Sequence, residues 1–155
     1  MIGFLYPWFQ LETDLHSHLY YKEIFISKIL TTIALVAGGV LPLFADISIY
    51  HLLNPDWDSH ARVHEAWRLS TNFCIFSLGM YLLWAKQKEM LPAILSLCIH
   101  FGFFIAVITM PLYGGTSMGE GINEPVSFGL PLNVLLFTSM LIIQLTAIVL
   151  IVRKK

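Results

Sequence analysis

Two histidines lie four residues apart in the stretch DWDSHARVHEAW, at His60 and His64. Residues at this spacing share one face of a helix, so the two imidazoles are expected to lie side by side. Such a pair can transfer protons near neutral pH, or bind a divalent metal ion once a further ligand joins it. The candidates for this further group are Asp46 and His51 from the end of the first helix, or Glu120 and Glu124 from the later loop, and the predicted metal ligands are His51, His60 and His64. The order H-A-R-V-H lacks the glutamate of the zinc-protease motif, which excludes that class.

Carboxylates that could complete an acid–base site flank these histidines. Asp46 lies at the end of the preceding apolar run, and Glu65 follows His64 directly. The predicted catalytic residues are His60, His64, Asp46, Glu65, Glu120 and Glu124. The predicted substrate-binding residues are Trp57, Trp67, Arg68, Asn72, His100 and Asn123. The alternative is an interfacial cluster without chemistry, in which Arg68 pairs with Glu65.

A second polar segment runs from Tyr113 to Pro125 and contains four glycines between positions 114 and 121. Glycine permits a close approach of the backbone, so this loop could fold over the histidines. It would bring Glu120, Asn123 and Glu124 to them. The alternative is an ordinary flexible connection. The loop has neither a dinucleotide-binding glycine pattern nor a phosphate-loop lysine.

His100 lies in the middle of an apolar run. An ionisable side chain at membrane depth usually faces the protein interior and has a partner. The simplest interpretation is a neutral imidazole bonded to Gln144, Ser96 or a carbonyl. The functional alternatives are a polar contact in a substrate cavity, a proton relay or a haem ligand.

The composition determines which elements must position these residues. The chain has 155 residues, of which 57% are hydrophobic and 12% charged, with a mean hydropathy of +0.73. A soluble domain of this length cannot bury so much apolar surface, so lipid is the expected solvent. The net charge of −1 gives no reason to expect nucleic acid as a partner.

Four apolar stretches are long enough to be transmembrane helices. The fold class is therefore expected to be all-α, an integral membrane four-helix bundle with up-down topology and a single domain over 1–155. The expected helices are about 29–52, 59–85, 91–113 and 130–152. The aromatic-rich residues before position 29 are expected to form an interfacial segment.

Turn and capping signals separate the first two helices. Asn54-Pro55-Asp56 is a typical turn sequence. The helix that follows can be capped by Asp56, Asp58 or Ser59.

The distribution of basic residues predicts the orientation. Seven lysines and arginines lie on the side of the termini, and only Arg62 and Arg68 lie on the other side. This bias places both termini in the cytoplasm. The loops 54–68 and 114–129 then share the outer face.

The run NPDWDSHARVHEAW resembles a motif of small bacterial four-helix membrane proteins of unknown function, N-P-[DE]-W-x-x-H-A-[RK]-x-H. The matching positions are Asn54, Pro55, Asp56, Trp57, His60, Ala61, Arg62 and His64. The resemblance implies a bacterial inner membrane protein; the endoplasmic reticulum is the alternative. The overall plan is loosely similar to the emopamil-binding, sterol-isomerase superfamily, which implies acids and histidines acting on a lipid-like substrate. None of that superfamily's functional residues can be transferred to particular positions here.

These observations predict a membrane-embedded enzyme with a His/carboxylate site at the outer face. Its substrate would be a lipid-like or isoprenoid molecule, and the reaction an isomerisation or a hydrolysis. A divalent metal ion is the one cofactor that the residues suggest. The alternatives are a non-catalytic lipid- or metal-binding membrane protein and an accessory subunit of a larger membrane complex. The expected partners are membrane lipids, a lipophilic small molecule and a second copy of the chain.

Overall fold

The described part of the chain is helical apart from one short hairpin. The computed structural model describes residues 6–116 and 125–153, and the side chains from Leu19 on. The helices are α1 (Tyr6–Gly39), α2 (Leu41–Asp46), α3 (Ser59–Met80) with a π-helical end η1 (Tyr81–Ala85), α4 (Met90–Tyr113) and α5 (Leu132–Arg153). The antiparallel strands β1 (Val126–Ser127) and β2 (Leu130–Pro131) precede α5.

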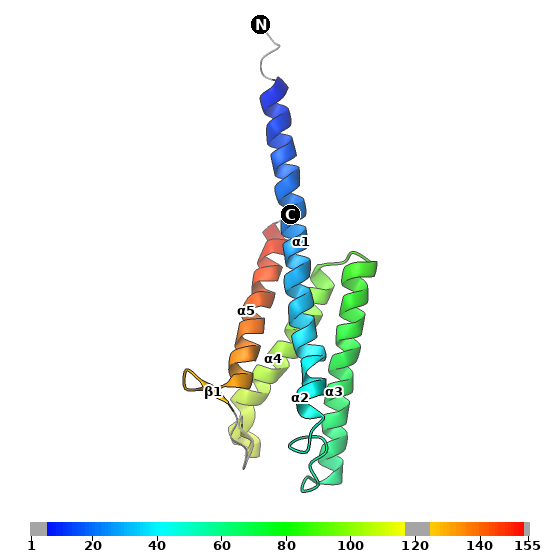
Figure 1. Ribbon diagram of the computed structural model, residues 1–155, viewed down its shortest axis with the longest axis vertical. Coiled ribbons are helices and arrows are strands. Elements are labelled where there is room, and N and C mark those ends of the chain that lie inside the picture. Colours follow the sequence, from blue (N-terminus) through cyan, green and yellow to red (C-terminus); the bar gives the residue numbers. More distant parts are fainter. Residues whose placement is uncertain (1–5, 117–124, 154–155) are drawn as a thin grey trace.

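The first predicted helix is the one whose bounds are wrong. Helix α1 begins at Tyr6 instead of 29, so the segment expected to lie at the interface continues the helix, which projects beyond the others (Figure 1). It ends at Gly39, and the short α2 follows and ends at Asp46 rather than 52. Pro42 explains the break, because proline has no N–H and its ring collides with the carbonyl four residues earlier. The other three predicted helices agree with the structure within two residues.

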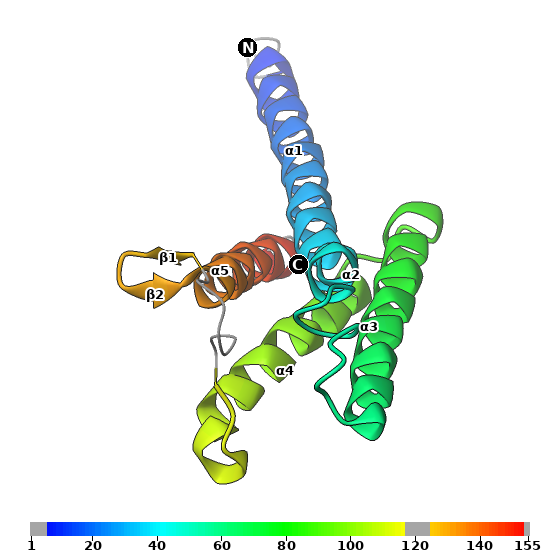
Figure 2. The ribbon, with the colours of Figure 1, turned by 60° about the horizontal axis from the view of Figure 1, so that its bottom comes forward.

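Successive long helices run in opposite directions. In Figure 1, α1 and α4 descend while α3 and α5 ascend. Helix α4 runs obliquely from the end of α3 toward the start of α5, which is also visible in Figure 2. Helix α1 packs against α3, α4 and α5. The connection before α3 and the hairpin before α5 lie at the same end of the molecule.

Among residues 19–116 and 125–153, three helical segments are long and apolar enough to cross a membrane: Leu19–Asp46, Met90–Tyr113 and Leu132–Arg153. Their surfaces fit this, since large apolar side chains such as Ile108 and Leu112 are 75% and 84% exposed. Helix α3, which the sequence also predicted to span, is not among the three because its first turns are polar. The structure thus supports an integral membrane protein.

Small residues allow α1 to approach its neighbours closely. A methyl group on Gly39 would come within 2.3 Å of Cβ of Phe76 in α3. One on Gly79 of α3 would come within 2.9 Å of the Leu35 side chain, and one on Gly38 within 2.8 Å of Ile99 in α4. Glycine at such contacts is typical of membrane helices, where dispersion between close backbones replaces the hydrophobic effect. These three contacts fix α1 against both α3 and α4.

Candidate functional site

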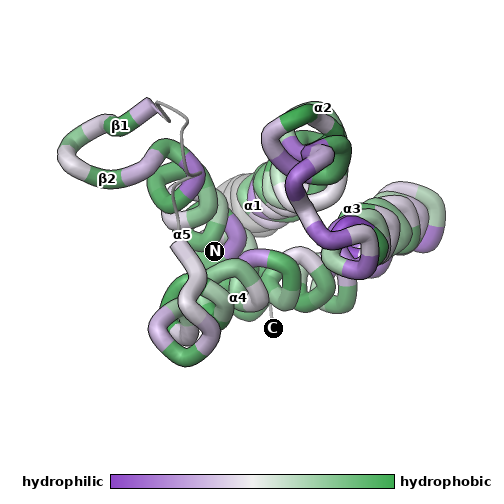
Figure 3. The backbone as a smooth tube through the Cα atoms, turned by 90° about the horizontal axis from the view of Figure 1, so that it is seen from below, coloured by the Kyte–Doolittle hydropathy of each residue, from purple (hydrophilic) through white to green (hydrophobic). Residues whose placement is uncertain are grey.

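Local hydrogen bonds build the polar start of α3 as the sequence predicted. The amide of Asp56 donates to Oδ1 of Asn54 at 2.9 Å, which closes the predicted turn. Asp58 is the N-cap, with its Oδ1 accepting from the amide of His60 at 2.8 Å. The first turn of α3 is therefore fixed by its own sequence. Figure 3 shows hydrophilic segments gathered along the α2–α3 connection and the first turns of α3.

The two histidines lie side by side, as their spacing predicts. Their Nε2 atoms are 3.0 Å apart and the rings meet edge to face. Both side chains are exposed, and the indole of Trp67 lies beside His64 with its centroid 6.1 Å from the imidazole. Within the described part of the chain, the histidines hydrogen-bond through their side chains only to each other. They form an exposed imidazole pair without a carboxylate partner among those residues.

The nearby carboxylates are held by Arg68. Arg68 Nε donates to Oε2 of Glu65 at 2.9 Å, and its Nη2 contacts both Glu65 and Asp46. The predicted pairing with Glu65 is confirmed. Partial burial acts to lower the pKa of the Arg68 guanidinium, but the hydrogen bonds and charges of Glu65 and Asp46 outweigh it, so the pKa is raised above its ordinary value. Arg68 therefore stays cationic and keeps both carboxylates engaged.

The predicted third metal ligand lies elsewhere. His51 contacts Ser48 through Nδ1 at 3.5 Å and packs edge to face against Trp57, with ring centroids 6.2 Å apart. No group of three His, Cys, Asp or Glu residues close enough to hold a metal ion occurs in residues 19–116 and 125–153. Asn72 is half-buried beside α1. Its backbone carbonyl oxygen would lie 2.9 Å from a methyl group added to Gly39.

The glycine-rich loop leaves part of the prediction open. Glu120, Asn123 and Glu124 lie outside the described residues. The described hairpin and the first turn of α3 lie on opposite sides of α1 and α4 in Figure 3. Convergence of this loop with His60 and His64 stays a prediction.

A second group of polar residues is buried among the three helices that are long and apolar enough to span a membrane. We call this group the polar row: Thr31 of α1, Ser96 and His100 of α4, and Gln144 of α5. All four side chains are 0% exposed. Five of their polar atoms have no hydrogen-bond partner among the described residues: Thr31 Oγ1, Ser96 Oγ, His100 Nε2, and both Nε2 and Oε1 of Gln144.

His100 is oriented by its own helix. Nδ1 lies 2.7 Å from the carbonyl oxygen of Ser96, and a carbonyl only accepts, so Nδ1 is the donor. The prediction that His100 bonds to a carbonyl is confirmed. In a neutral imidazole this leaves Nε2 as an acceptor. The ring lies between α1, 3.5 Å from a methyl group built on Gly38, and Phe137 of α5, with centroids 5.7 Å apart.

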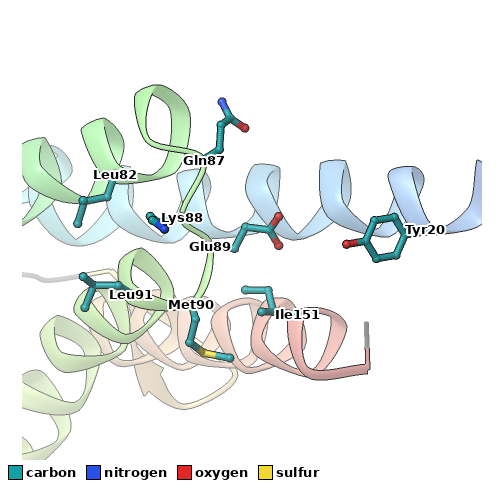
Figure 4. A pocket seen from close by; sticks show the side chains of 8 residues that line it. All are labelled: Tyr20, Leu82, Gln87, Lys88, Glu89, Met90, Leu91 and Ile151. Carbon is teal, nitrogen blue, oxygen red and sulfur yellow. The ribbon is translucent and has the colours of Figure 1, made fainter. Parts of the chain in front are cut away.

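A groove of about 590 Å³ opens at the end of the molecule opposite the histidine pair, where α3 connects to α4. Figure 4 shows its lining, which combines apolar and polar side chains: Tyr20, Leu82, Gln87, Lys88, Glu89, Met90, Leu91 and Ile151. A carboxylate oxygen of Glu89 accepts from the hydroxyl of Ser27 at 3.4 Å, and Ser27 is 0% exposed. Thr31 follows Ser27 by one turn of α1, so polar groups continue from the groove toward the polar row.

Helix geometry indicates the depth of the row. Gln144 lies seven residues before Ile151, and Ser96 seven residues after Glu89, which is about 10 Å at 1.5 Å per residue. Since Ile151 and Glu89 both line the groove, the two polar groups lie at a similar depth below it. His100 lies one further turn along α4. The polar row thus lies about two to three helical turns from the groove, within helices that are long and apolar enough to cross a membrane.

Sequence reasoning named Ser96 and Gln144 as possible partners of His100, but it missed Thr31 and the neighbouring Ser27 of α1. Ser27 and Thr31 were overlooked because single hydroxyl residues are common in membrane helices. One signal was present in the sequence, since Ser27, Thr31, Ala34 and Gly38 repeat at helical spacing and mark a small-residue face of α1. That signal identifies the face but not the helices that pack on it.

Comparison with known proteins adds no functional evidence. No protein-family model, curated protein or solved structure matches the chain. The resemblances to small bacterial membrane proteins and to the sterol-isomerase superfamily stay predictions. The polar row and the histidine pair are the two features of the structure that bear on function.

Proposed function

We propose that this protein binds a lipophilic molecule inside the membrane and that the polar row receives the molecule's head group. In this proposal the four long helices form an up-down bundle in a bacterial inner membrane. Both termini face the cytoplasm, and so does the groove at the start of α4. The histidine pair then faces the outer compartment.

The five unpaired polar atoms of the row carry the proposal. Leaving a buried polar atom without a partner costs about 1–3 kcal/mol, and hydrocarbon offers no water to replace the partner. A ligand group that bonds to these atoms recovers that free energy. The row combines acceptors at His100 Nε2 and Gln144 Oε1 with a donor at Gln144 Nε2, and its two hydroxyls can do either.

The chemistry of the row defines the kind of head group. None of its four residues carries a fixed charge, and an unpaired charge is costly at this depth. The favoured head group is therefore uncharged and both donates and accepts hydrogen bonds, as an alcohol does. The mixed lining of the groove suits such a molecule. Leu82, Met90 and Leu91 can contact an apolar tail, and Glu89 accepts a hydrogen bond from Ser27 on the side of the polar row.

Binding without chemistry is favoured over the catalytic interpretation. Asp46 and Glu65, the described carboxylates that were expected to act with the histidines, both contact Arg68. A carboxylate held by a permanent cation is a poor proton acceptor. Catalysis by His60 and His64 stays a prediction, and so does a role as an accessory subunit.

Extraction of bound molecules tests the proposal. The full chain is purified from membranes in mild detergent, and the organic extract is analysed by mass spectrometry. We expect one neutral, hydroxyl-bearing lipophile near stoichiometric amount in the wild type. It should be lost from both Gln144→Leu and His100→Leu, because each removes hydrogen-bonding atoms from the row.

Thr146→Val is the matched control. Thr146 lies on the exposed face of α5 and bonds to the carbonyl of Ile142 at 2.9 Å. This variant should retain the lipophile as the wild type does. Equal retention by the wild type and both row variants would contradict the proposal, as would a wild-type extract containing only bulk membrane lipids in their ordinary proportions.

A further inference from the structure

The histidine pair at the start of α3 has the properties of a metal site rather than of a buried structural contact. Both rings are exposed, and their Nε2 atoms share a hydrogen bond of 3.0 Å, so one of the two carries the proton. When a metal ion replaces this hydrogen bond, that imidazole loses the proton from Nε2 to solvent and takes one up at Nδ1, so that each Nε2 offers a lone pair. Neither Nε2 contacts a carboxylate within the described residues, so no ion pair competes for the lone pairs. A water-facing pair of convergent imidazoles is available to a cation from solution.

We propose that His60 and His64 form a two-imidazole site for a single divalent copper or nickel ion. The proposal is separate from lipophile binding, since it involves other residues at the opposite end of the spanning helices. The expected ligands are the two Nε2 atoms. Water completes the coordination, because both side chains face solvent.

The separation of the two nitrogen atoms favours this class of metal. Imidazole nitrogen binds such ions at about 2.0–2.1 Å. Two ligands at 90° are then about 2.9 Å apart, whereas two ligands at the tetrahedral angle are about 3.4 Å apart. The hydrogen-bonded pair already has its two nitrogen atoms 3.0 Å apart, so the 90° arrangement needs less side-chain movement than the tetrahedral one. Tetragonal coordination by nitrogen and oxygen is typical of Cu²⁺ and Ni²⁺, while Zn²⁺ prefers a tetrahedron.

His51 does not belong to this site. Its ring packs against Trp57 and its Nδ1 contacts Ser48. The contacts of His51 reduce the metal ligands predicted from the sequence from three histidines to two, His60 and His64. It also provides a control, because His51 is close in the sequence but engaged elsewhere.

Trp67 offers a local reporter. Its ring lies 6.1 Å from the His64 ring, so a paramagnetic Cu²⁺ ion bound to the pair would quench its fluorescence. The experiment titrates CuSO₄, and separately NiCl₂, into the full chain in detergent micelles. Calorimetry measures stoichiometry and affinity, and fluorescence measures proximity to Trp67.

We expect one Cu²⁺ ion per chain at this site, with quenching that Trp67→Phe reduces. His60→Ala and His64→Ala should each weaken that binding about ten-fold or more, since losing even an outer-shell partner of a metal ligand costs 10–100-fold. His64→Gln should behave as His64→Ala does, which separates metal ligation from general polarity. His51→Ala should bind as the wild type does. Circular dichroism should report unchanged helicity, because both histidines are exposed.

A spacing control isolates the geometry. In the His64→Ala background, Ala61→His restores the number of histidines but places them on neighbouring positions, which do not face each other on a helix. This double variant should not recover the affinity. The proposal is overturned if His60→Ala and His64→Ala bind Cu²⁺ as the wild type does, or if the double variant binds equally well.

Discussion

The start of α3 and the polar row differ in how their polar groups are satisfied. At the start of α3, Asp58 caps the helix and Arg68 holds Glu65 and Asp46. In the polar row, uncharged residues at membrane depth keep five atoms without a partner among the described residues. At the charged start of α3, the carboxylates thus have partners within the protein. The uncharged polar row has hydrogen-bonding atoms that are not used by the described residues.

On the proposed function, in which the polar row binds a head group, charge density is a poor guide to the lipophile site of this protein. An exposed ion pair exchanges water for a partner and gains little, about 0–1 kcal/mol. A buried hydroxyl or amide has no water to return to, so an unpaired atom there is costly. Pairing a buried polar atom of the row should therefore change the free energy more than forming an exposed ion pair does.

Gly39→Ala should cause the largest loss of stability, because it disturbs the close contact between α1, which carries Thr31 of the polar row, and α3. The added methyl group would lie 2.3 Å from Cβ of Phe76 and 2.9 Å from the backbone carbonyl oxygen of Asn72. The backbones of α1 and α3 must therefore separate. We expect a loss of about 1–3 kcal/mol of stability, as is usual for overpacking. Thermal unfolding in micelles measures it.

Gly102→Ala is the control for that prediction. A methyl group on Gly102 meets no atom within 4 Å, so this variant should be neutral or gain up to about 1 kcal/mol from helix propensity. Similar unfolding temperatures for the two variants would argue against a close α1–α3 contact.

Gln144→Leu tests whether the polar row has unpaired atoms in the ligand-free protein. Replacing an amide that has no partner with an apolar side chain of similar size should raise the stability of ligand-free protein by about 1–3 kcal/mol. Denaturant titration of delipidated samples measures the change, with Thr146→Val as the reference. A loss of stability would mean that the amide of Gln144 is already satisfied without a ligand.

Arg68→Met addresses the other region and should have the smallest effect. The Arg68 side chain is 42% exposed, whereas those of Asp46 and Glu65 are 20% and 14% exposed, so losing these partly screened ion pairs should cost about 1 kcal/mol. The deficit should shrink in about 1 M salt, which screens exposed charges. Arg62→Met is the matched control, since Arg62 makes no ion pair within the described residues. A deficit that does not depend on salt would indicate that this ion-pair cluster is more buried than its exposure suggests.

Several local features could be predicted because they depend on neighbours in the sequence. The turn at Asn54, the cap at Asp58 and the contact between His60 and His64 each involve residues no more than four apart. The pairing of Glu65 with Arg68 is of the same kind. Where a prediction depended on a helix continuing, it was less accurate, as the break before Pro42 shows.

The sequence by itself determined that the chain is helical and suited to a membrane, since periodic apolar runs and local caps suffice for that. The tertiary structure decided which polar groups are paired. Asp46 reaches Arg68 across 22 residues, and the polar row joins Thr31, His100 and Gln144 from three helices. The physical reason is that burial and hydrogen bonding at membrane depth depend on which helix faces pack together, and a helix's own sequence does not specify its partner.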